Sequence, residues 1–153
     1  MTRLEHVNLV SRDMNATLAF LQVAFPDWKI RGRGQNEWYG VKREWLHFGT
    51  DDFYITLNEG SQEDNRDLKG HSPGLAHIGI VVDDLNAVVE RLESQGYEIS
   101  IIGADHPYRK NVYFEEASGF EFEFVQYLSE SSEKRNMYGG ETSDIQRKST
   151  TLP

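Results

Sequence analysis

Two stretches of the chain, one beginning at residue 4 and the other at residue 75, open in the same way. Six residue pairs keep one spacing of 71 positions, the distance from His6 to His77: Leu4 and Leu75, His6 and His77, Val10 and Val81, Asp13 and Asp84, Asn15 and Asn86, and Ala16 and Ala87. Self-similarity at a fixed spacing across so many residue types indicates two copies of one supersecondary unit. Each copy carries a histidine at the same position.

Each copy is predicted to be a strand, a helix and then three strands. The first strand alternates so that its histidine lies opposite its apolar residues, and an aspartate then caps a helix with apolar residues at helical spacing. In the first copy the later strands fall at residues 28–31, within 37–49 and at 53–58, with a turn at Gly32 and Gly34. In the second copy they fall at 98–102, 110–115 and 120–128.

The predicted organisation is one domain over residues 1–128, followed by a polar C-terminal extension over 129–153. The domain contains a first module at about 4–59, a linker at 60–74 and a second module at about 75–128. The linker is rich in Ser, Asp, Asn and Gly, and the extension shows no hydrophobic period. Met137 and Tyr138 are the residues of the extension expected to dock on the body or on a partner.

Charge and composition limit the partners. The 153 residues carry a formal net charge of −9, which argues against nucleic acid and against anionic membrane surfaces. There is no cysteine and no apolar run of membrane length, so disulfides, thiolate metal sites and a membrane span are excluded. We expect a soluble, cytoplasmic protein that binds a small molecule.

The final strand directs a carboxylate toward the histidine-bearing face. Strict alternation from Gly119 to Tyr127 puts three phenylalanines on the helix side and aims Glu121 and Glu123 at the face of His77. Two imidazoles and one carboxylate form a set that binds Fe(II), Mn(II), Zn(II) or Ni(II) and leaves positions open for a substrate. We therefore expect His6, His77 and Glu123 to be metal ligands, with Glu121 as the alternative carboxylate or a supporting group.

The repeated unit, its two histidines, and Tyr113-Phe114 followed by Gly119 and Glu123 resemble the vicinal oxygen chelate superfamily. This superfamily includes glyoxalase I, extradiol dioxygenases, methylmalonyl-CoA epimerase, fosfomycin-modifying enzymes and bleomycin-binding proteins. The resemblance covers about residues 4–128 and implies an α+β fold, in which two βαβββ modules form a cup-shaped mixed sheet around a metal. It also implies a homodimer with sites at the interface, where His6 of one chain meets His77 and Glu123 of the other.

One position departs from the pattern of several relatives. Many of them take a further Glu or Gln ligand from the last strand of the first module, where this chain has Thr56. The departure counts against glyoxalase I and the epimerase. The remaining ligands, two histidines and one glutamate, resemble those of dioxygenases and fosfomycin enzymes.

A partial ring-cleavage signature, with Ala117 in place of its proline, runs through His106, Val112-Tyr113, Glu116, Gly119 and Glu123. It implies that His106 and Tyr113 hydrogen-bond a metal-bound oxygen or exchange protons with it. The alternative is that His106 is a surface loop residue and that Tyr113 only packs.

The sequence thus favours a metal-dependent enzyme, a lyase, dioxygenase or transferase, that acts on a small molecule with vicinal oxygens. An extradiol-dioxygenase-like reaction fits the partial signature. The alternative is a metal-free binding protein like the bleomycin-resistance proteins, with Trp38, Trp45 and Tyr54 as walls for a hydrophobic or aromatic ligand. Thr56 supports this alternative, whereas His6, His77 and Glu123 support the enzyme.

Overall fold

The computed structural model describes residues 2–138, and the chain divides into two compact units. Of the described residues, unit 1 contains those up to Ala76 together with Glu116–Phe120, and unit 2 contains His77–Glu115 and those from Glu121 to Tyr138. Most of the C-terminal extension predicted at 129–153, from residue 139 on, lies outside the described residues.

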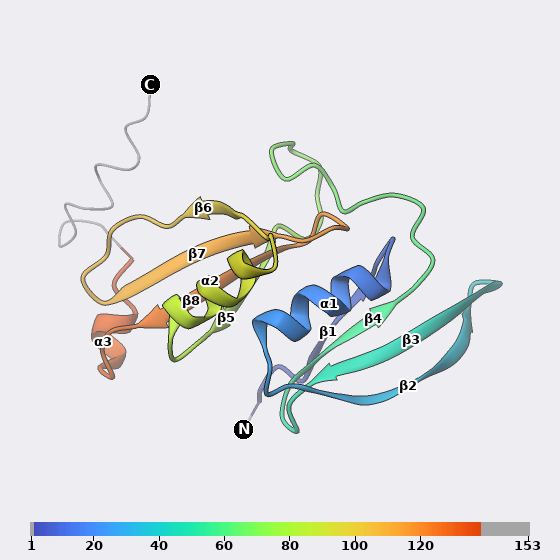
Figure 1. The fold of residues 1–153 in the computed structure, drawn as a ribbon, viewed down its shortest axis with the longest axis horizontal. Coiled ribbons are helices and arrows are strands. Elements are labelled where there is room, and N and C mark those ends of the chain that lie inside the picture. Colours follow the sequence, from blue (N-terminus) through green and yellow to red (C-terminus); the bar gives the residue numbers. More distant parts are fainter. Residues whose placement is uncertain (1, 139–153) are drawn as a thin grey trace. The chain divides into compact units, whose positions relative to one another are not determined.

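Unit 1 is built around a four-stranded mixed sheet with the strand order β1-β4-β3-β2 (Figure 1). Strand β1 pairs in parallel with β4, and the other two pairings are antiparallel. Its elements are β1 (His6–Val10), α1 (Met14–Ala24), β2 (Lys29–Trp38), β3 (Val41–Gly49) and β4 (Tyr54–Asn58).

Unit 2 repeats this arrangement with the strand order β5-β8-β7-β6, in which β5 and β8 are parallel. A short helix, α3, follows the last strand. The elements are β5 (His77–Val81), α2 (Leu85–Ser94), β6 (Ile99–Ile102), β7 (Arg109–Glu115), β8 (Glu121–Tyr127) and α3 (Ser132–Arg135). The predicted α+β fold of two βαβββ modules is confirmed.

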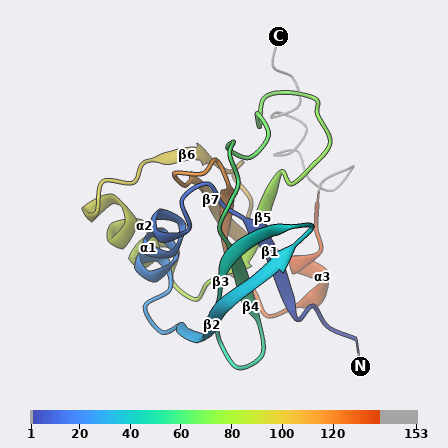
Figure 2. The same cartoon turned by 90° about the vertical axis from the view of Figure 1, so that its right-hand side faces the viewer.

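Each long helix begins where the sequence predicted and covers one face of its own sheet (Figure 2). The Asp13 carboxylate accepts a hydrogen bond from Ala16 N at 2.9 Å, and the Asp84 carboxylate accepts one from Ala87 N at 3.1 Å. These caps satisfy N–H groups that have no partner within the helix. The covered sheet face is apolar, and its phenylalanines at 48, 114, 122 and 124 are almost fully buried. The opposite face is left for polar residues.

The turn predicted at Gly32 and Gly34 is wrong, because both glycines lie inside β2. The chain reverses instead at Tyr39 and Gly40, whose φ angles are +49° and +81°. The glycines leave room for the indole of Trp45 on β3, and a Cβ atom at Gly34 would stand 3.0 Å from that ring. The glycines therefore mark a close approach of a side chain across the strand pair.

A buried polar cluster fixes the segment Glu116–Phe120 within unit 1. Glu116 is 4% exposed and accepts hydrogen bonds from the Thr17 hydroxyl at 2.7 Å and from Ser118 N at 2.9 Å. The Ser11 hydroxyl lies 2.8 Å from those of both Thr17 and Ser118. Glu116 and Gly119, which the ring-cleavage signature includes, thus have structural roles here, since Gly119 supplies the positive φ of +77° in the same turn.

The beginning of the C-terminal extension packs on unit 2. His106 Nε2 lies 2.8 Å from the carbonyl oxygen of Met137, and the Arg109 guanidinium lies 4.7 Å from the centre of the Tyr138 ring. Helix α3 is capped by Ser131, whose hydroxyl accepts from Lys134 N. Over the described part of the chain, no helix is long and apolar enough to cross a membrane.

Burial raises the pKa of Glu116, although the Thr17 hydroxyl and two backbone N–H groups oppose the rise. The folded state therefore holds this proton more tightly than the unfolded chain does. The stability contributed by Glu116 is complete below its unfolded pKa and is lost as the pH rises through the raised folded value.

We predict that Glu116→Gln, which does not titrate, gains stability relative to the wild type as the pH rises above about 4, where an unfolded glutamate loses its proton. Denaturant unfolding at a series of pH values measures the difference in unfolding free energy. Glu115→Gln, at an exposed neighbouring position, is the matched control and should show no such trend. A difference for Glu116→Gln that does not change with pH would contradict the prediction.

Candidate metal and ligand site

An imidazole and a carboxylate meet on the open face of the unit 2 sheet. His77 Nε2 lies 3.3 Å from Glu123 Oε2, and the two side chains are 40% and 18% exposed. Glu123 stands directly across from Gly79 of β5, where a Cβ atom would come within 3.5 Å of Oε2. A side chain at Gly79 would thus meet this carboxylate in ordinary van der Waals contact. The predicted alternation of β8 is confirmed.

Two residues of β7 surround the Glu123 carboxylate. Asn111 Nδ2 donates to Glu123 Oε1 at 2.6 Å and to the Tyr113 hydroxyl oxygen at 3.2 Å. The amide is itself confined, because a Cβ atom on Gly103 would overlap it. Asn111 thus fixes one carboxylate oxygen and leaves Oε2 facing His77.

The Tyr113 hydroxyl keeps its proton over the whole physiological range. Desolvation and the adjacent Glu123 carboxylate raise the pKa of Tyr113 to about 12, against the smaller opposing effect of Asn111. Because the hydroxyl oxygen accepts from Asn111, its own hydrogen can be directed at the Glu123 carboxylate beside it. The ring also meets His77 edge to face, with centroids 5.4 Å apart.

These groups line a cavity of about 600 Å³ within unit 2. It extends from His77 and Glu123 along β7 to the loop between β6 and β7, and Tyr138 also lines it. Glu121, the alternative carboxylate, is almost buried and accepts from the Ser100 hydroxyl at 3.2 Å. Of the two glutamates, Glu123 is therefore the one paired with His77.

His106 lines the same cavity, but backbone groups occupy both of its ring nitrogens. Tyr108 N donates to Nδ1 at 3.1 Å, and Nε2 lies 2.8 Å from the Met137 carbonyl oxygen. A ring with Nδ1 as acceptor and a hydrogen on Nε2 satisfies both bonds. The structure thus gives His106 a role in holding the C-terminal segment.

The strand register of unit 1 shows which residue corresponds to Glu123. Asn8 pairs with Thr56 in β1 and β4, as Gly79 pairs with Glu123 in β5 and β8. Thr56 therefore occupies the position of the glutamate, as the sequence predicted. His47 pairs with Thr56 in the way that Tyr113 pairs with Glu123.

Rings stack across the corresponding face of unit 1. His6 and His47 lie 4.9 and 4.6 Å from Tyr54, centroid to centroid, with interplanar angles of 15° and 29°. Trp45 lies 4.8 Å from His47, and the Arg31 guanidinium lies 4.3 Å above the Tyr54 ring. His6 Nδ1 is 2.8 Å from Glu5 Oε2, so Nε2 is the nitrogen left to bind another group.

The strand register shifts at one matched place in each unit, at Arg31 in β2 and at Ser100 in β6. Both residues lie at a bulge, and each contacts the residue that pairs with the histidine of its unit. Arg31 lies over Tyr54, and Ser100 donates to Glu121. The two open faces thus correspond position by position but differ in chemistry.

The residues of unit 2 fit two ligands of one divalent ion. Two atoms that bind the same ion lie about 2.0 to 2.2 Å from it, with a donor–ion–donor angle of about 90 to 110°. They are then about 3 to 3.5 Å apart, and the distance of 3.3 Å between His77 Nε2 and Glu123 Oε2 falls in this range. Taken unit by unit over residues 2–138, no three His, Asp or Glu side chains form a complete group for a metal.

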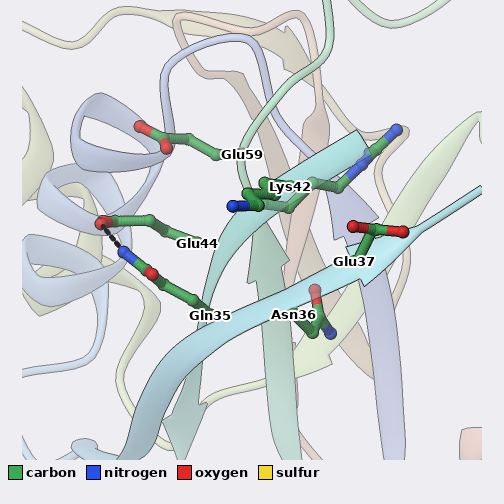
Figure 3. Close-up of a pocket in the computed structure, with 7 residues that line it drawn as sticks. Gln35, Asn36, Glu37, Lys42, Glu44 and Glu59 are labelled. Carbon is green, nitrogen blue, oxygen red and sulfur yellow. Dashed lines mark hydrogen bonds between the residues drawn. The ribbon is translucent and has the colours of Figure 1, made fainter. Parts of the chain in front are cut away.

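A separate hollow of about 370 Å³ lies along the β2–β3 hairpin of unit 1 (Figure 3). Glu37, Lys42 and Glu44 line it, and Gln35 Nε2 donates to Glu44 Oε1 at 3.2 Å. None of the predicted site residues lines this hollow. Its charges alternate in sign on an exposed hairpin, as on an ordinary solvated surface.

The chain belongs to the Glyoxalase/Bleomycin resistance protein/Dioxygenase superfamily, whose family model matches residues 3–124. This confirms the resemblance drawn from the repeated strand and its histidines. No curated protein sequence matches the chain significantly.

Solved structures with the same fold include a glyoxylase/bleomycin resistance protein/dioxygenase domain from Frankia sp. EAN1pec. It is 22% identical with a TM-score of 0.69, and the match covers 90% of this chain and 99% of that one. FosX of Listeria monocytogenes, a fosfomycin resistance protein solved with Mn(II) and a sulfate ion, is 21% identical with a TM-score of 0.61, at the same coverage. At these identities the likeness concerns the fold.

Two residues that support the site, Asn111 and Gly103, received no role from the sequence. Asn111 lies two positions before Tyr113, and residues two apart on a strand share one face. This spacing is the signal that could have placed Asn111 at the site. Gly103 gave no local signal, because the Asn111 amide for which it makes room comes from a neighbouring strand. Such glycines are recognised only when the partner across the sheet is known.

We predict that Gly103→Ala lowers the unfolding free energy by about 1 to 3 kcal/mol through overpacking against the Asn111 amide. In an Asn111→Ala background the same substitution should cost much less, because the smaller side chain leaves room for the new methyl group. A double-mutant cycle by denaturant unfolding measures this coupling. Strictly additive effects would show that the two positions do not compete for the same space.

Proposed function

We propose that the protein is a metal-dependent enzyme that acts on a small molecule presenting two adjacent oxygens. His77 and Glu123 are two ligands of a divalent ion in this proposal, and His6 is the third. The observation that carries it is the His77–Glu123 pair, whose donor atoms are 3.3 Å apart on the wall of an open cavity. The Mn(II) described in FosX of Listeria monocytogenes supports a divalent ion in this fold. Iron, manganese, zinc and nickel all suit the donor set.

The surroundings of His6 support its role as a ligand. Metal-binding histidines commonly donate their second ring N–H to a carboxylate, which orients the ring and raises its basicity. Glu5 lies in this position at Nδ1, and the Tyr54 ring stacks on the imidazole. Nε2 is then the atom that binds the ion.

When bound, the ion would hold the two substrate oxygens and stabilise negative charge that develops on them. Asn111 keeps one oxygen of Glu123 occupied, so that the other remains directed at the ligand position. Tyr113 is the proton donor of the proposal, because its side chain lines the cavity next to Glu123 and is held there by Asn111. His106 supports the cavity wall and does not carry protons, since backbone groups hold both of its nitrogens.

The reaction class is a lyase, dioxygenase or transferase reaction of the vicinal oxygen chelate type. Thr56 replaces the carboxylate or amide that some relatives use as an extra ligand or base, which disfavours a glyoxalase I reaction. Tyr113 at the cavity wall favours a reaction in which a substrate oxygen accepts a proton. Ring cleavage of an extradiol type is one such reaction.

A metal-free binding protein is the second candidate, and the ring stack of unit 1 favours it. His6, Tyr54, His47 and Trp45 present edges and faces suited to a planar ligand, with Arg31 beside them. Trp38, the third wall expected from the sequence, lies under Arg43 at the end of β2. The metal content of the purified protein discriminates between the two candidates.

We predict that protein purified without chelator retains one divalent ion per chain, and that His77→Ala and Glu123→Gln each abolish this retention. The reason is that each variant removes one of three ligands. Elemental analysis after gel filtration measures the ion. His47→Gln and Glu121→Gln are the controls and should keep the metal, and loss of metal from these controls but not from His77→Ala would refute the ligand set.

We further propose a homodimer in which His6 of one chain completes the His77 and Glu123 site of the other. A mixture of His6→Ala and His77→Ala chains should then regain metal, because one of its two sites takes all three ligands from unaltered positions. Metal content of the isolated mixed dimer measures this recovery.

The matched control for this experiment is a mixture of His77→Ala and Glu123→Gln chains. Both changes lie in unit 2, so every site of that mixed dimer lacks one ligand and no metal should return. If the first mixture recovers no metal either, the shared site is ruled out.

A further inference from the structure

We propose that Arg109 is the anion-binding residue of the His77–Glu123 cavity, held in position by Tyr138 of the C-terminal segment. The substrate then carries an anionic group, such as a carboxylate, in addition to its two adjacent oxygens. This inference rests on the proposed function and names the substrate class for the same site.

Arg109 lies on the cavity face of β7. It alternates with Asn111 and Tyr113 along the strand, and all three line the cavity together with Glu123. Arg109 stands four residues from Tyr113, which is about 13 Å along an extended strand. A ligand held near Glu123 by one end therefore extends along β7 toward the guanidinium.

The charges of the cavity single out this side chain. Of the residues that line it within 77–138, Arg109 is the one with a permanently positive side chain, whereas Asp105, Glu121 and Glu123 are acidic. Among residues 2–138, Arg109 forms no ion pair with a carboxylate. Its N–H donors thus remain available to a ligand. They are also needed, because the three carboxylates would repel an anion that found no positive side chain in the cavity.

Tyr138 fixes the guanidinium without using its hydrogen-bond donors. Arg109 Cζ lies 4.7 Å from the ring centre, within the range of a cation–π contact. A guanidinium packed on a ring face keeps its N–H groups free at the edge, in the fork that matches a carboxylate. The tyrosine also lines the cavity itself, so its ring forms a wall beside the bound anion.

The segment that carries Tyr138 is anchored at three other points. Arg135 lies 4.2 Å from the Tyr127 ring centre, and Lys134 Nζ lies 5.1 Å from that of Tyr108. His106 donates through Nε2 to the Met137 carbonyl oxygen, one residue before Tyr138. The catalytic role that the sequence suggested for His106 is replaced by this anchoring role in the proposal.

The test compares catechol with 3,4-dihydroxybenzoate, which share the same pair of adjacent oxygens and differ by one carboxylate. Isothermal titration of Zn(II)-loaded protein measures both affinities, and zinc has no redox chemistry that would consume the probes. We expect the wild type to prefer the carboxylate probe, and Arg109→Gln to weaken its binding about tenfold or more while leaving catechol unchanged.

Tyr138→Ala, like Arg109→Gln, should reduce the preference for 3,4-dihydroxybenzoate over catechol. Tyr138→Phe keeps the ring and should retain this preference. Lys110→Gln is the matched control for charge, because it removes a positive side chain from the adjacent, exposed position on the other face of β7. If Lys110→Gln weakens binding of 3,4-dihydroxybenzoate as much as Arg109→Gln does, the effect comes from overall charge and not from a specific contact, and the proposed anion site is overturned. Equal affinities in the wild type and Arg109→Gln would also overturn it.

A second measurement separates failure of this inference from failure of the proposed function. The Nε–H resonance of Arg109 in metal-free, ¹⁵N-labelled protein should shift when 3,4-dihydroxybenzoate is added, and Tyr138→Ala should abolish the shift. If the protein takes up no metal, the proposed function fails, and this shift still supports the anion site. An unmoved resonance overturns the anion site whether or not metal binds.

Discussion

Parallel pairing of the first and last strands of each module is the constraint on which the site depends. In unit 2 it sets His77 beside Glu121 and Gly79 beside Glu123, so that an imidazole and a carboxylate from distant parts of the chain stand on one face. A parallel pair needs a crossover between its strands, and here the helix and two further strands supply it. The helix covers one face of the sheet, which leaves the other for polar chemistry.

Much of this arrangement could be predicted because its signals are local. The duplicated strand opening, the aspartate caps and the alternation that aims Glu123 away from the phenylalanines all lie within a few residues of one another. The glycines of β2 could not be interpreted in the same way, because their cause is the Trp45 indole on a neighbouring strand. Two glycines close together are as typical of a turn as of a close approach.

The role of Glu116 was hidden for a related reason. Its partner Thr17 is 99 positions away in the chain, and the contact exists only once the β7–β8 turn packs within unit 1. His106 shows the same limit, because the Met137 carbonyl oxygen that lies beside its Nε2 is 31 positions away in the chain. Residue type and spacing indicate which groups can react, but burial and hydrogen-bond partners decide which ones are free to do so.

The matched bulges at Arg31 and Ser100 have a consequence for how such a protein can diversify. A bulge residue takes no part in the strand pairing, so its side chain can change while the hydrogen-bond ladder stays in place. In both copies that side chain touches the residue beside the histidine, a cation over a ring in one and a hydroxyl on a carboxylate in the other. Substitution at these two positions alters the chemistry of the open face without removing a strand pairing, so ligand preference can drift separately in each half of a duplicated scaffold.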